Sequence, residues 1–427
     1  MILIKDIAKF VGQEVEINAW VYNFRSSGKI AFWQLRDGSG FVQAILSSSD
    51  LSLDKWQNAE KVTQESSVKI FGLVSKHPKK EEYEIQVKDF SFFQIADEYP
   101  ISNKDHGIEF LQDNRHLWLR SKRQWAIQRV RNTLILGLYE FMEKNDFIKI
   151  DSPIITPNAG ENTTDLFEVN YFDDKAYLSQ TGQLYIEAAI FSHGRVFDFG
   201  PTFRAEKSKT RRHLTEFWMM DAEMAFVNLD ENLKIQEELI RFMVSKVLEN
   251  NRYELEILER DTKVLENIVK PFYRFTYSEA LKELHELGSD IKDGDDLGAD
   301  DETMLTKKYD NPIFITNYPA EVKAFYMERN KNDNSKAECA DLLAPEGYGE
   351  IIGGSQREAD YVKLKESIEK NSLPLKDFEW YLDLRKYGSV PHGGFGFGLE
   401  RIVTWVCGLK HIRESIPFAR TIYRFRP

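Results

Sequence analysis

Cysteine and long apolar runs are both scarce in this sequence, and each scarcity excludes a class of protein. The two cysteines, Cys339 and Cys407, lie far apart and have no CxxC spacing. They argue against a disulfide framework and against structural zinc, and we expect both thiols to be packed in the interior. No stretch approaches the roughly 20 apolar residues that span a bilayer, and the first residues lack the apolar core of a signal peptide. We therefore expect a cytoplasmic protein without a membrane partner.

The net charge of -12 at pH 7 would be unusual for a nucleic-acid-binding protein, but charge acts locally rather than as a total. Much of the acidity lies in residues 251–310, and we expect the run DIKDGDDLGADDE (290–302) to be a solvated insertion. The stretch from Arg115 to Arg131 is basic instead. Two interpretations of it stay open, a helix face in water and a surface that contacts phosphates.

A chain of 427 residues is too long for one compact core, so two or three domains are expected. Residues 1–95 contain five short runs of alternating apolar residues, separated by turn clusters such as RSSGK and RDGSG. This pattern predicts a small antiparallel barrel of about five strands. Its size suits the oligonucleotide-binding (OB) fold, although other small barrels have a similar strand number. Residues 96–115 are polar and are interpreted as a linker.

The remaining residues, 116–427, predict a second domain, which makes the whole chain α+β. Segments 122–145 and 232–249 carry apolar residues at helical spacing and predict two helices. Strands are expected in runs that follow one another without regular intervening helices: FIKIDSPIIT, VFDFGPTFRAE, EFWMMDAEMAF, PIFITNY, AFYMERN and AECADLLAPE. This order favours an antiparallel sheet flanked by helices, with residues 251–310 as an acidic insertion.

The stretch FRAEKSKTRRHLTEF (203–217) places many charges between apolar flanks. We interpret it as two strands joined by a charged loop. Because alternate strand residues share a face, Arg204 and Glu206 point one way, and Phe217 shares a face with Asp221. Buried charges need a partner or a ligand, so this face predicts either an internal network of arginine and glutamate or a binding site.

A second candidate site is PHGGFGFGLERIVTW, near the end of the sequence. Its glycines at 394, 396 and 398 allow a backbone to approach another group closely. A helix beginning near Leu399 offers free amides and the positive end of its dipole, and Arg401 follows within a turn. The pattern does not fit a dinucleotide-binding unit, where the glycines follow an early parallel strand. Amides and a fixed arginine suit an anionic phosphate tail.

Together these stretches resemble the class II aminoacyl-tRNA synthetases. Three family motifs occur in order: FIKIDSP with Pro153, then FRAE with RHLTEFWMMD, then GFGFGLER. An OB-fold before such a core is found in the branch that charges aspartate, asparagine and lysine, and the resemblance covers essentially the whole chain. It implies ATP and a transfer RNA as substrates. It also implies a homodimer, because the first motif forms the subunit interface in the family.

The resemblance assigns roles in ATP binding residue by residue. Arg204 is expected at the α-phosphate, Phe217 against the adenine and Arg401 at the γ-phosphate. Glu350 matches the carboxylate that holds Mg2+, whereas Gly353 stands where some relatives have a hydroxyl that adds a second ligand. The implied catalytic residues are Arg204, Arg401 and Glu350. The implied ATP-binding residues are Arg204, Glu206, Arg212, His213, Phe217, Glu350, Gly398 and Arg401.

The implied amino-acid pocket favours asparagine over aspartate. Ile186 stands where aspartyl enzymes have a lysine that neutralises the substrate carboxylate, and Asp221 would accept from an amide but repel a carboxylate. Arg357 is expected to grip a substrate oxygen. Glu161 and Gln183 are assigned to the surroundings of the α-amino group. The implied substrate is therefore L-asparagine.

The implied tRNA is tRNA-Asn, whose anticodon would be read by Phe32 and Gln43 of the barrel through stacking and base-edge contacts. Three alternatives stay open. One is an aspartate-specific or non-discriminating aspartyl-tRNA synthetase, against which Ile186 argues. Another is a paralogue that makes asparagine, although such paralogues lack the anticodon domain. The last is a nucleic-acid-binding protein that has kept the fold and lost catalysis, which intact Arg204, Glu350 and Arg401 disfavour.

Overall fold

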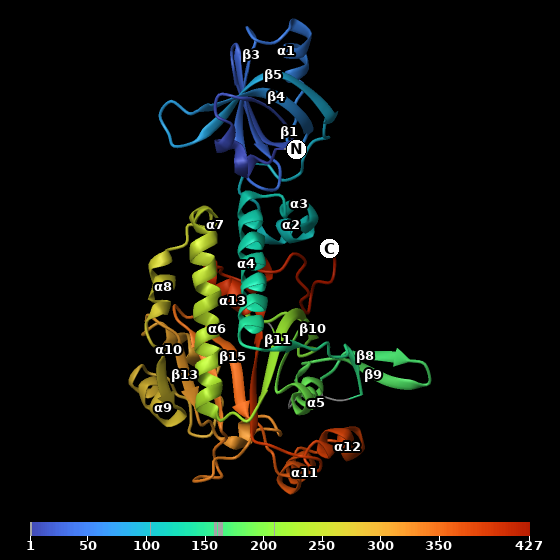
Figure 1. Ribbon diagram of the computed structural model, residues 1–427, viewed down its shortest axis with the longest axis vertical. Coiled ribbons are helices and arrows are strands. Elements are labelled where there is room, and N and C mark those ends of the chain that lie inside the picture. The colour runs from blue at the N-terminus through green and yellow to red at the C-terminus, as the bar shows by residue number, and fades with distance from the viewer. Residues whose placement is uncertain (1, 103, 158–159, 161–164, 209) are drawn as a thin grey trace. The chain divides into compact units, whose positions relative to one another are not determined.

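The computed structural model describes residues 2–102, 104–157, 160, 165–208 and 210–427. The chain divides into two compact units, Met1–Leu111 and Gln112–Pro427 (Figure 1). The domain boundaries expected from the sequence, 1–95, 96–115 and 116–427, stay predictions. Across the described residues, none of the helices combines the length and the apolarity needed to pass through a bilayer.

The first unit is a closed barrel, and all five strands expected in it are present. They are β1 (Glu14–Ser27), β2 (Ile30–Arg36), β3 (Phe41–Ser47), β4 (Ser67–Lys76) and β5 (Tyr83–Gln94), in the order β1-β2-β3-β5-β4. The pair β3–β5 is parallel, which differs from the expected antiparallel arrangement. The reason is topological, since a ring with an odd number of strands cannot alternate direction at every step. Every second side chain of β1 from Val15 to Val21 is buried in the barrel interior.

The second unit is built on an eight-stranded sheet in the order β12-β13-β14-β15-β16-β11-β10-β6. These strands are β6 (Ile148–Lys149), β10 (Arg195–Phe203), β11 (Glu216–Ala225), β12 (Tyr273–Thr276), β13 (Ile313–Thr316), β14 (Cys339–Ala344), β15 (Gly349–Gln356) and β16 (His392–Gly398). The inner pairs are antiparallel as expected, but the outermost pairs, β12–β13 and β10–β6, are parallel. The sheet is therefore mixed. A separate small sheet joins β7 (Ile155–Thr156), β9 (Asp174–Leu178) and β8 (Glu168–Tyr171).

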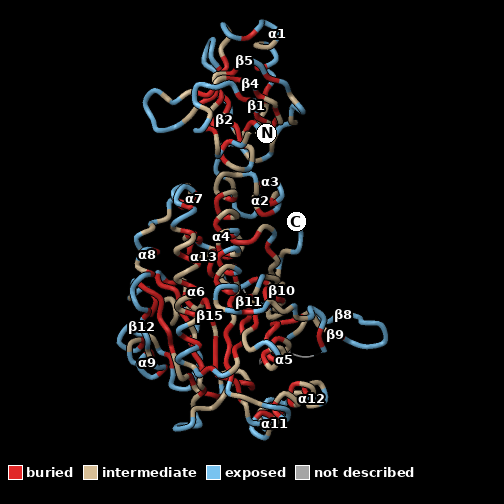
Figure 2. The backbone as a smooth tube through the Cα atoms, in the orientation of Figure 1, coloured by how far each residue is buried: buried red, intermediate tan, exposed pale blue. Residues whose placement is uncertain are grey.

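One face of the large sheet is covered by the helices α4 (Lys122–Lys144), α6 (Leu229–Asn250) and α13 (Leu399–Val406). Side chains from these helices and from alternate positions of β11, among them Met220 and Ala222, form the largest apolar core. In Figure 2 the inner strands of this sheet are mostly red, that is, buried. The two helices expected from apolar spacing are thus confirmed as α4 and α6.

The remaining helices of the described chain are short, with at most 11 residues. They are α1 (Leu53–Ala59) in the barrel, α2 (Ile108–Asp113), α3 (Arg115–Trp118), α5 (Gln183–His193), α7 (Arg252–Ile257), α8 (Thr262–Glu266), α9 (Tyr277–Glu286), α10 (Ala299–Thr306), α11 (Tyr361–Lys370) and α12 (Leu375–Asp383). Short 3-10 turns are η1 (Ile4–Phe10), η2 (Asn267–Val269), η3 (Ala320–Val322) and η4 (Ile412–Glu414).

One expectation about local structure was wrong, and two charged segments are only partly exposed to water. Residues 324–330 form isolated bridges, not a strand, because the chain turns there between β13 and β14. The run 290–302 is solvated only in part: most of its aspartates are exposed, but Ile291 and Leu297 are buried in a core cluster and α10 starts within the run. The basic stretch from Arg115 to Arg131 is buried at its two ends, whereas Arg120 within it is exposed.

The arginines at the two ends of this basic stretch form contacts within the second unit. Arg115 is buried and donates to the backbone carbonyls of Pro417, at 2.7 Å, and Ile416, at 2.8 Å. Arg131 forms a buried ion pair of 2.8 Å with Glu400 on α13. These arginines therefore tie the first helices of the unit to its C-terminal segment. The two cysteines are free and buried, as expected.

Candidate active site

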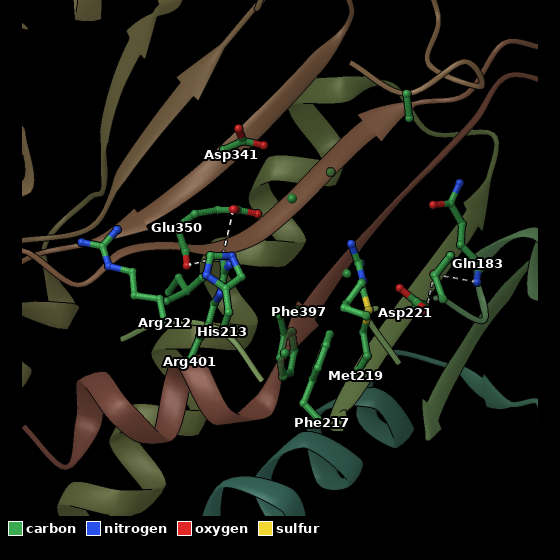
Figure 3. Close-up of a pocket in the computed structure, with 18 of the residues that line it drawn as sticks. Gln183, Arg212, His213, Phe217, Met219, Asp221, Asp341, Glu350, Phe397 and Arg401 are labelled. Carbon is green, nitrogen blue, oxygen red and sulfur yellow. Dashed lines mark hydrogen bonds and ion pairs between the residues drawn. The ribbon is translucent and has the colours of Figure 1, made fainter. Parts of the chain in front are cut away.

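A cavity of about 650 Å³ opens on the sheet face opposite the helical core. Alternation along β11 explains its position, because Met220 and Ala222 pack into the core while Phe217, Met219 and Asp221 point into the cavity. The cavity unites most of the residues selected from the sequence, namely Gln183, Arg204, Glu206, Arg212, His213, Phe217, Asp221, Glu350, Arg357, Gly398 and Arg401. Figure 3 shows the charged groups around Glu350 and Arg401 at one end, Asp221 and Gln183 at the other, and Phe217 between them.

The glycines of β16 make room for cavity side chains on β11. The register pairs Gly396 with Asp221 and Gly394 with Glu223 across the two strands. A Cβ atom on Gly396 would overlap the Asp221 carboxylate and lie 2.8 Å from the Met219 methyl carbon. A Cβ atom on Gly394 would overlap the Glu223 carboxylate in the same way. The alternating glycines therefore allow carboxylates to stand directly over the neighbouring strand.

Replacing Gly396 by alanine should lower stability by about 1–3 kcal/mol, because the added methyl group has no space without moving a carboxylate. Thermal unfolding measures this loss. Gly200 on β10 is a matched control, since an added Cβ there meets only one Asp198 oxygen, at 3.8 Å. Equal melting temperatures for the two variants would contradict this account of the glycine pattern.

At the end of the cavity nearest α13, Arg401 and Glu350 form an ion pair. The Arg401 guanidinium donates to the Glu350 carboxylate at 2.9 Å and to the backbone carbonyl of the same residue at 3.0 Å. Arg204 leaves the end of β10 and lies with its guanidinium carbon 6.0 Å from the centre of the Phe217 ring. His213 follows in the loop, with Nδ1 3.0 Å from the Ser208 hydroxyl. This end therefore offers cations beside an aromatic face.

Two carboxylates face each other beside these cations. A Cβ atom at Gly353 would lie 3.4 Å from Glu350 Oε1 and 3.7 Å from Asp341 Oδ1, so position 353 lies between the two acids. Burial raises the pKa of Asp341 to about 6. The charge of Glu350 also raises this pKa, whereas the ammonium group of Lys323 acts to lower it. Burial also acts to raise the pKa of Glu350, but Arg401 and Lys323 bring it below its usual value. The pair thus holds concentrated negative charge that a cation would stabilise.

Sequence reasoning missed five charged groups that line this cavity: Asp296, Glu302, Lys323, Asp341 and Glu400. The Lys323 ammonium donates to Asp341 at 2.8 Å and lies 3.7 Å from the centre of the Tyr318 ring. Alternation along the expected strand AECADLLAPE could have placed Asp341 on the face opposite to Ala340 and Leu342, which pack into the main core. Nothing in the sequence placed Lys323 or Glu302 beside it. Within the described chain, no group of three or more His, Cys, Asp or Glu side chains is arranged to hold a metal ion.

At the other end, Asp221 accepts hydrogen bonds from the backbone amide of Gly182 at 2.9 Å and from the Thr181 hydroxyl at 2.8 Å. Both donors precede α5, so Asp221 fixes the start of the helix that carries Gln183. Arg357 is buried and is held by the Glu223 carboxylate and by the Ser355 hydroxyl at 2.7 Å. This end of the cavity therefore contains a carboxylate acceptor and a guanidinium donor.

Arg357 belongs to a buried network of charged side chains. Burial raises the pKa of Glu223 to about 7, although Arg357 acts to lower it. Deeper in the unit, Glu187 accepts from the Tyr381 hydroxyl at 2.6 Å and from Arg385, and its carboxylate lies 2.8 Å from His392 Nε2. Burial opposes ionisation of Glu187, but Arg385 and His392 lower its pKa overall. The carboxylates are therefore balanced by cations within the same network.

The remaining selected residues lie elsewhere. Ile186 is fully buried in a cluster with Ile190 and Val196, and it is not among the residues that line the cavity. Glu161 lies outside the described residues. Phe32 and Gln43 belong to the barrel.

Phe32 and Gln43 share the outer face of the barrel. The register places Phe32 opposite Ile45 and Gln34 opposite Gln43, so their side chains alternate with the buried interior positions. The Arg25 guanidinium lies 4.6 Å from the centre of the Phe32 ring. Gln43 donates to the Glu84 carboxylate at 2.6 Å. This face combines an aromatic ring, a cation and an amide, which are the groups that bind splayed bases.

Comparison with known proteins agrees in both units. Residues 107–422 match the family of class II tRNA synthetases (D, K and N), and residues 15–93 match the OB-fold nucleic acid binding domain. An asparagine–tRNA ligase from Lactobacillus johnsonii is 52% identical over 429 aligned residues, covering 100% of this chain and 99% of that protein. One from Pelotomaculum thermopropionicum is 51% identical over 427 residues, with the same coverage. The crystal structure of asparaginyl-tRNA synthetase from Pyrococcus horikoshii, complexed with asparaginyl-adenylate, has a TM-score of 0.96 at 43% identity, covering 100% of this chain and 99% of that one.

Proposed function

We propose a function for this chain from one premise: it belongs to the class II tRNA synthetases for aspartate, lysine and asparagine (D, K and N). Within that family it acts as an asparagine–tRNA ligase. It activates L-asparagine with ATP to asparaginyl adenylate and pyrophosphate, and then transfers asparagine to the 3′ end of tRNA-Asn. One observation carries the proposal: the arginines suited to phosphates and the pair suited to an amide, Asp221 and Arg357, line the same cavity.

In the first step the carboxylate of asparagine attacks the α-phosphorus of ATP, and the bond to pyrophosphate breaks. The role of Arg204 is to bind the α-phosphate and to stabilise the charge that develops there. Arg401 binds the γ-phosphate from the other side, and Phe217 stacks on the adenine with Glu206, Arg212 and His213 around the nucleotide. Because displacement at phosphorus requires mainly positioning and charge stabilisation, no nucleophilic side chain is needed.

ATP enters this reaction with Mg2+, as is general in the family. Glu350 and Asp341 suit that ion, since both offer hard oxygen donors and position 353 between them carries no side chain. Bound there, Mg2+ would supply charge neutralisation on the phosphates. Arg401 contributes separately, because its two bonds to Glu350 hold that carboxylate at the edge of the cavity.

The choice of asparagine follows from Asp221 and Arg357. The Asp221 carboxylate accepts from the side-chain amide NH2 of asparagine, whereas it repels the carboxylate of aspartate. Arg357 donates to the amide oxygen or to the α-carboxylate. Gln183 stands beside the α-amino group. A site that leaves a buried polar group unpaired with the wrong substrate can discriminate by several orders of magnitude.

In the second step the terminal ribose hydroxyl of tRNA-Asn attacks the activated carbonyl group, and AMP leaves. The barrel is proposed to read the anticodon, with Phe32 stacking on a base and Gln43 bonding to a base edge. A homodimer in the cytoplasm is part of the proposal, and its support is the resemblance around Pro153.

Exchange of pyrophosphate into ATP tests this proposal, with asparagine and aspartate compared at equal concentration. We expect exchange with asparagine to exceed exchange with aspartate by at least about 100-fold in kcat/KM. Faster exchange with aspartate would overturn the assignment in favour of an aspartyl enzyme. Exchange without charging of tRNA-Asn would favour an asparagine-making paralogue, although the matched OB-fold domain argues against it. No exchange with either amino acid would leave only a binding role.

A further inference from the structure

The acidic run 290–302 ends in a residue that the proposed reaction does not yet use. Glu302 lies in the first turn of α10 and is directed into the cavity, with its side chain 14% exposed. Its Oε2 atom accepts a hydrogen bond from the Arg212 guanidinium at 2.7 Å. The same atom accepts from the backbone amide of Glu350 at 3.1 Å. One carboxylate oxygen therefore joins the charged loop after β10 to the start of β15.

Arg212 is enclosed by further contacts on the same side. Its second terminal nitrogen donates to the carbonyl of Gly347 at 2.8 Å and to the Thr303 hydroxyl. Arg212 comes from the loop between β10 and β11, and its side chain is only 12% exposed. A guanidinium held in this way loses little additional freedom when a nucleotide binds.

The turn before β15 leaves room for this ion pair. Gly349 has a φ of 74° and Gly347 a φ of 82°, a region that residues with a Cβ atom rarely adopt. A Cβ atom on Gly349 would overlap both the Glu302 carboxylate and the Arg212 guanidinium. Position 349 therefore excludes a side chain for two independent reasons. Its φ is positive, and a Cβ atom would collide with the paired side chains of Glu302 and Arg212.

We propose that Glu302 is a positioning residue for ATP, which acts by holding the Arg212 guanidinium at the phosphate end of the cavity. The inference deepens the proposed function and rests on it for the identity of the nucleotide. Removal of Glu302 takes away the ion pair and leaves only the Thr303 and Gly347 contacts on Arg212, so the less restrained arginine must be ordered when ATP binds. The expected effect falls on ATP and not on the amino acid, because the amide-binding groups lie at the other end of the cavity (Figure 3).

A double-mutant cycle on the affinity for Mg-ATP tests this role. Calorimetric titration compares the wild type with Glu302→Ala, Arg212→Ala and the double variant. We expect Glu302→Ala to weaken binding by about 30-fold in the wild-type background, as for other buried charge pairs, and by less than about 3-fold when Arg212 is already alanine. Asp300→Ala, an exposed acid on the same helix, is the matched control and should leave affinity unchanged.

Equal losses in the two backgrounds would overturn the proposal, because Glu302 would then act independently of Arg212. Tighter ATP binding by Glu302→Ala would also overturn it, since the carboxylate would be sequestering the arginine. If the alanine variant does not fold, Glu302→Gln completes the same cycle with a smaller coupling. The titration contains no amino acid, so a wrong assignment of asparagine would show in the exchange assay and leave this result interpretable.

Discussion

Replacing Arg204 by alanine is expected to lower the rate of asparagine-dependent pyrophosphate exchange by about 10²–10³-fold, the loss typical of one preorganised donor to a developing charge. Arg204 lines the cavity beside Phe217 and extends from the end of β10, whose backbone remains paired with β11. The side chain can therefore be removed without cutting the sheet. We expect the melting temperature to stay within about 2 °C of the wild type, as for a substitution outside the core.

The matched control is Arg211→Ala, which removes an exposed cation from the same loop. If general positive charge were sufficient, the two variants would lose similar activity. If Arg204 acts at the α-phosphate, only Arg204→Ala is strongly impaired, and the loss appears in kcat as well as in the affinity for ATP. An Arg204→Ala enzyme with more than about a tenth of wild-type exchange would contradict the assigned role.

Replacing Arg357 by alanine is expected to cost about 3–5 kcal/mol of stability and to abolish measurable asparagine activation. The loss of stability arises because Glu223 would remain buried without its guanidinium partner. Burial already raises the pKa of Glu223 to about 7, and removal of Arg357 removes a cation that acts to lower it. The carboxyl group of the folded variant would therefore bind its proton more tightly than the wild type does.

This pKa shift gives the variant a characteristic pH dependence. An unfolded glutamate ionises near its ordinary pKa of 4.5, whereas Glu223 in the folded variant stays protonated to above pH 7. Between these values the folded state binds more protons than the unfolded state, so the stability of the variant falls as the pH rises. Chemical denaturation at pH 5.5 and pH 8 should show a larger deficit, relative to the wild type, at pH 8.

The double variant Glu223→Gln/Arg357→Met separates stability from binding. It removes the buried charge on both sides, so we expect most of the lost stability to return, since neutral replacement of a buried pair is often tolerated. Asparagine activation should remain absent, because the donor to the substrate is still missing. Recovery of activity in the double variant would show that Arg357 has only a structural role.

The parts of the fold that could be predicted are those whose side chains alternate or repeat with one period. The barrel strands and α4 belong here, because most buried side chains of each are apolar and follow the period of the element. The two faces of β11 were also predictable, since Phe217, Asp221 and Met220 follow strict alternation. The parallel pairs β3–β5 and β10–β6 were not, because strand direction depends on where the chain returns and not on any local pattern.

Charged residues were the least predictable part of the site. Local composition suggested that residues 290–302 lie in water, whereas Glu302 contacts Arg212, 90 positions away in the sequence. Arg115 looked available for phosphates but satisfies carbonyl groups about 300 residues later. Ile186 was also placed wrongly by a local pattern. Helical spacing put it on the same face as Gln183, but its side chain packs in a neighbouring apolar cluster. Long-range pairing of charges leaves almost no trace in a single sequence.

The odd number of strands in the barrel also bears on how that unit meets other chains. The parallel pair β3–β5 closes the ring through residues 43–45 and 84–86, so neither strand presents an open edge over its full length. Exposed aromatic side chains on strands, such as those of Trp20 and Phe24, invite strand addition and aggregation when an edge is open. Closure of the ring shortens the available edge, so the barrel can expose aromatic side chains with less risk of pairing with a strand of another chain.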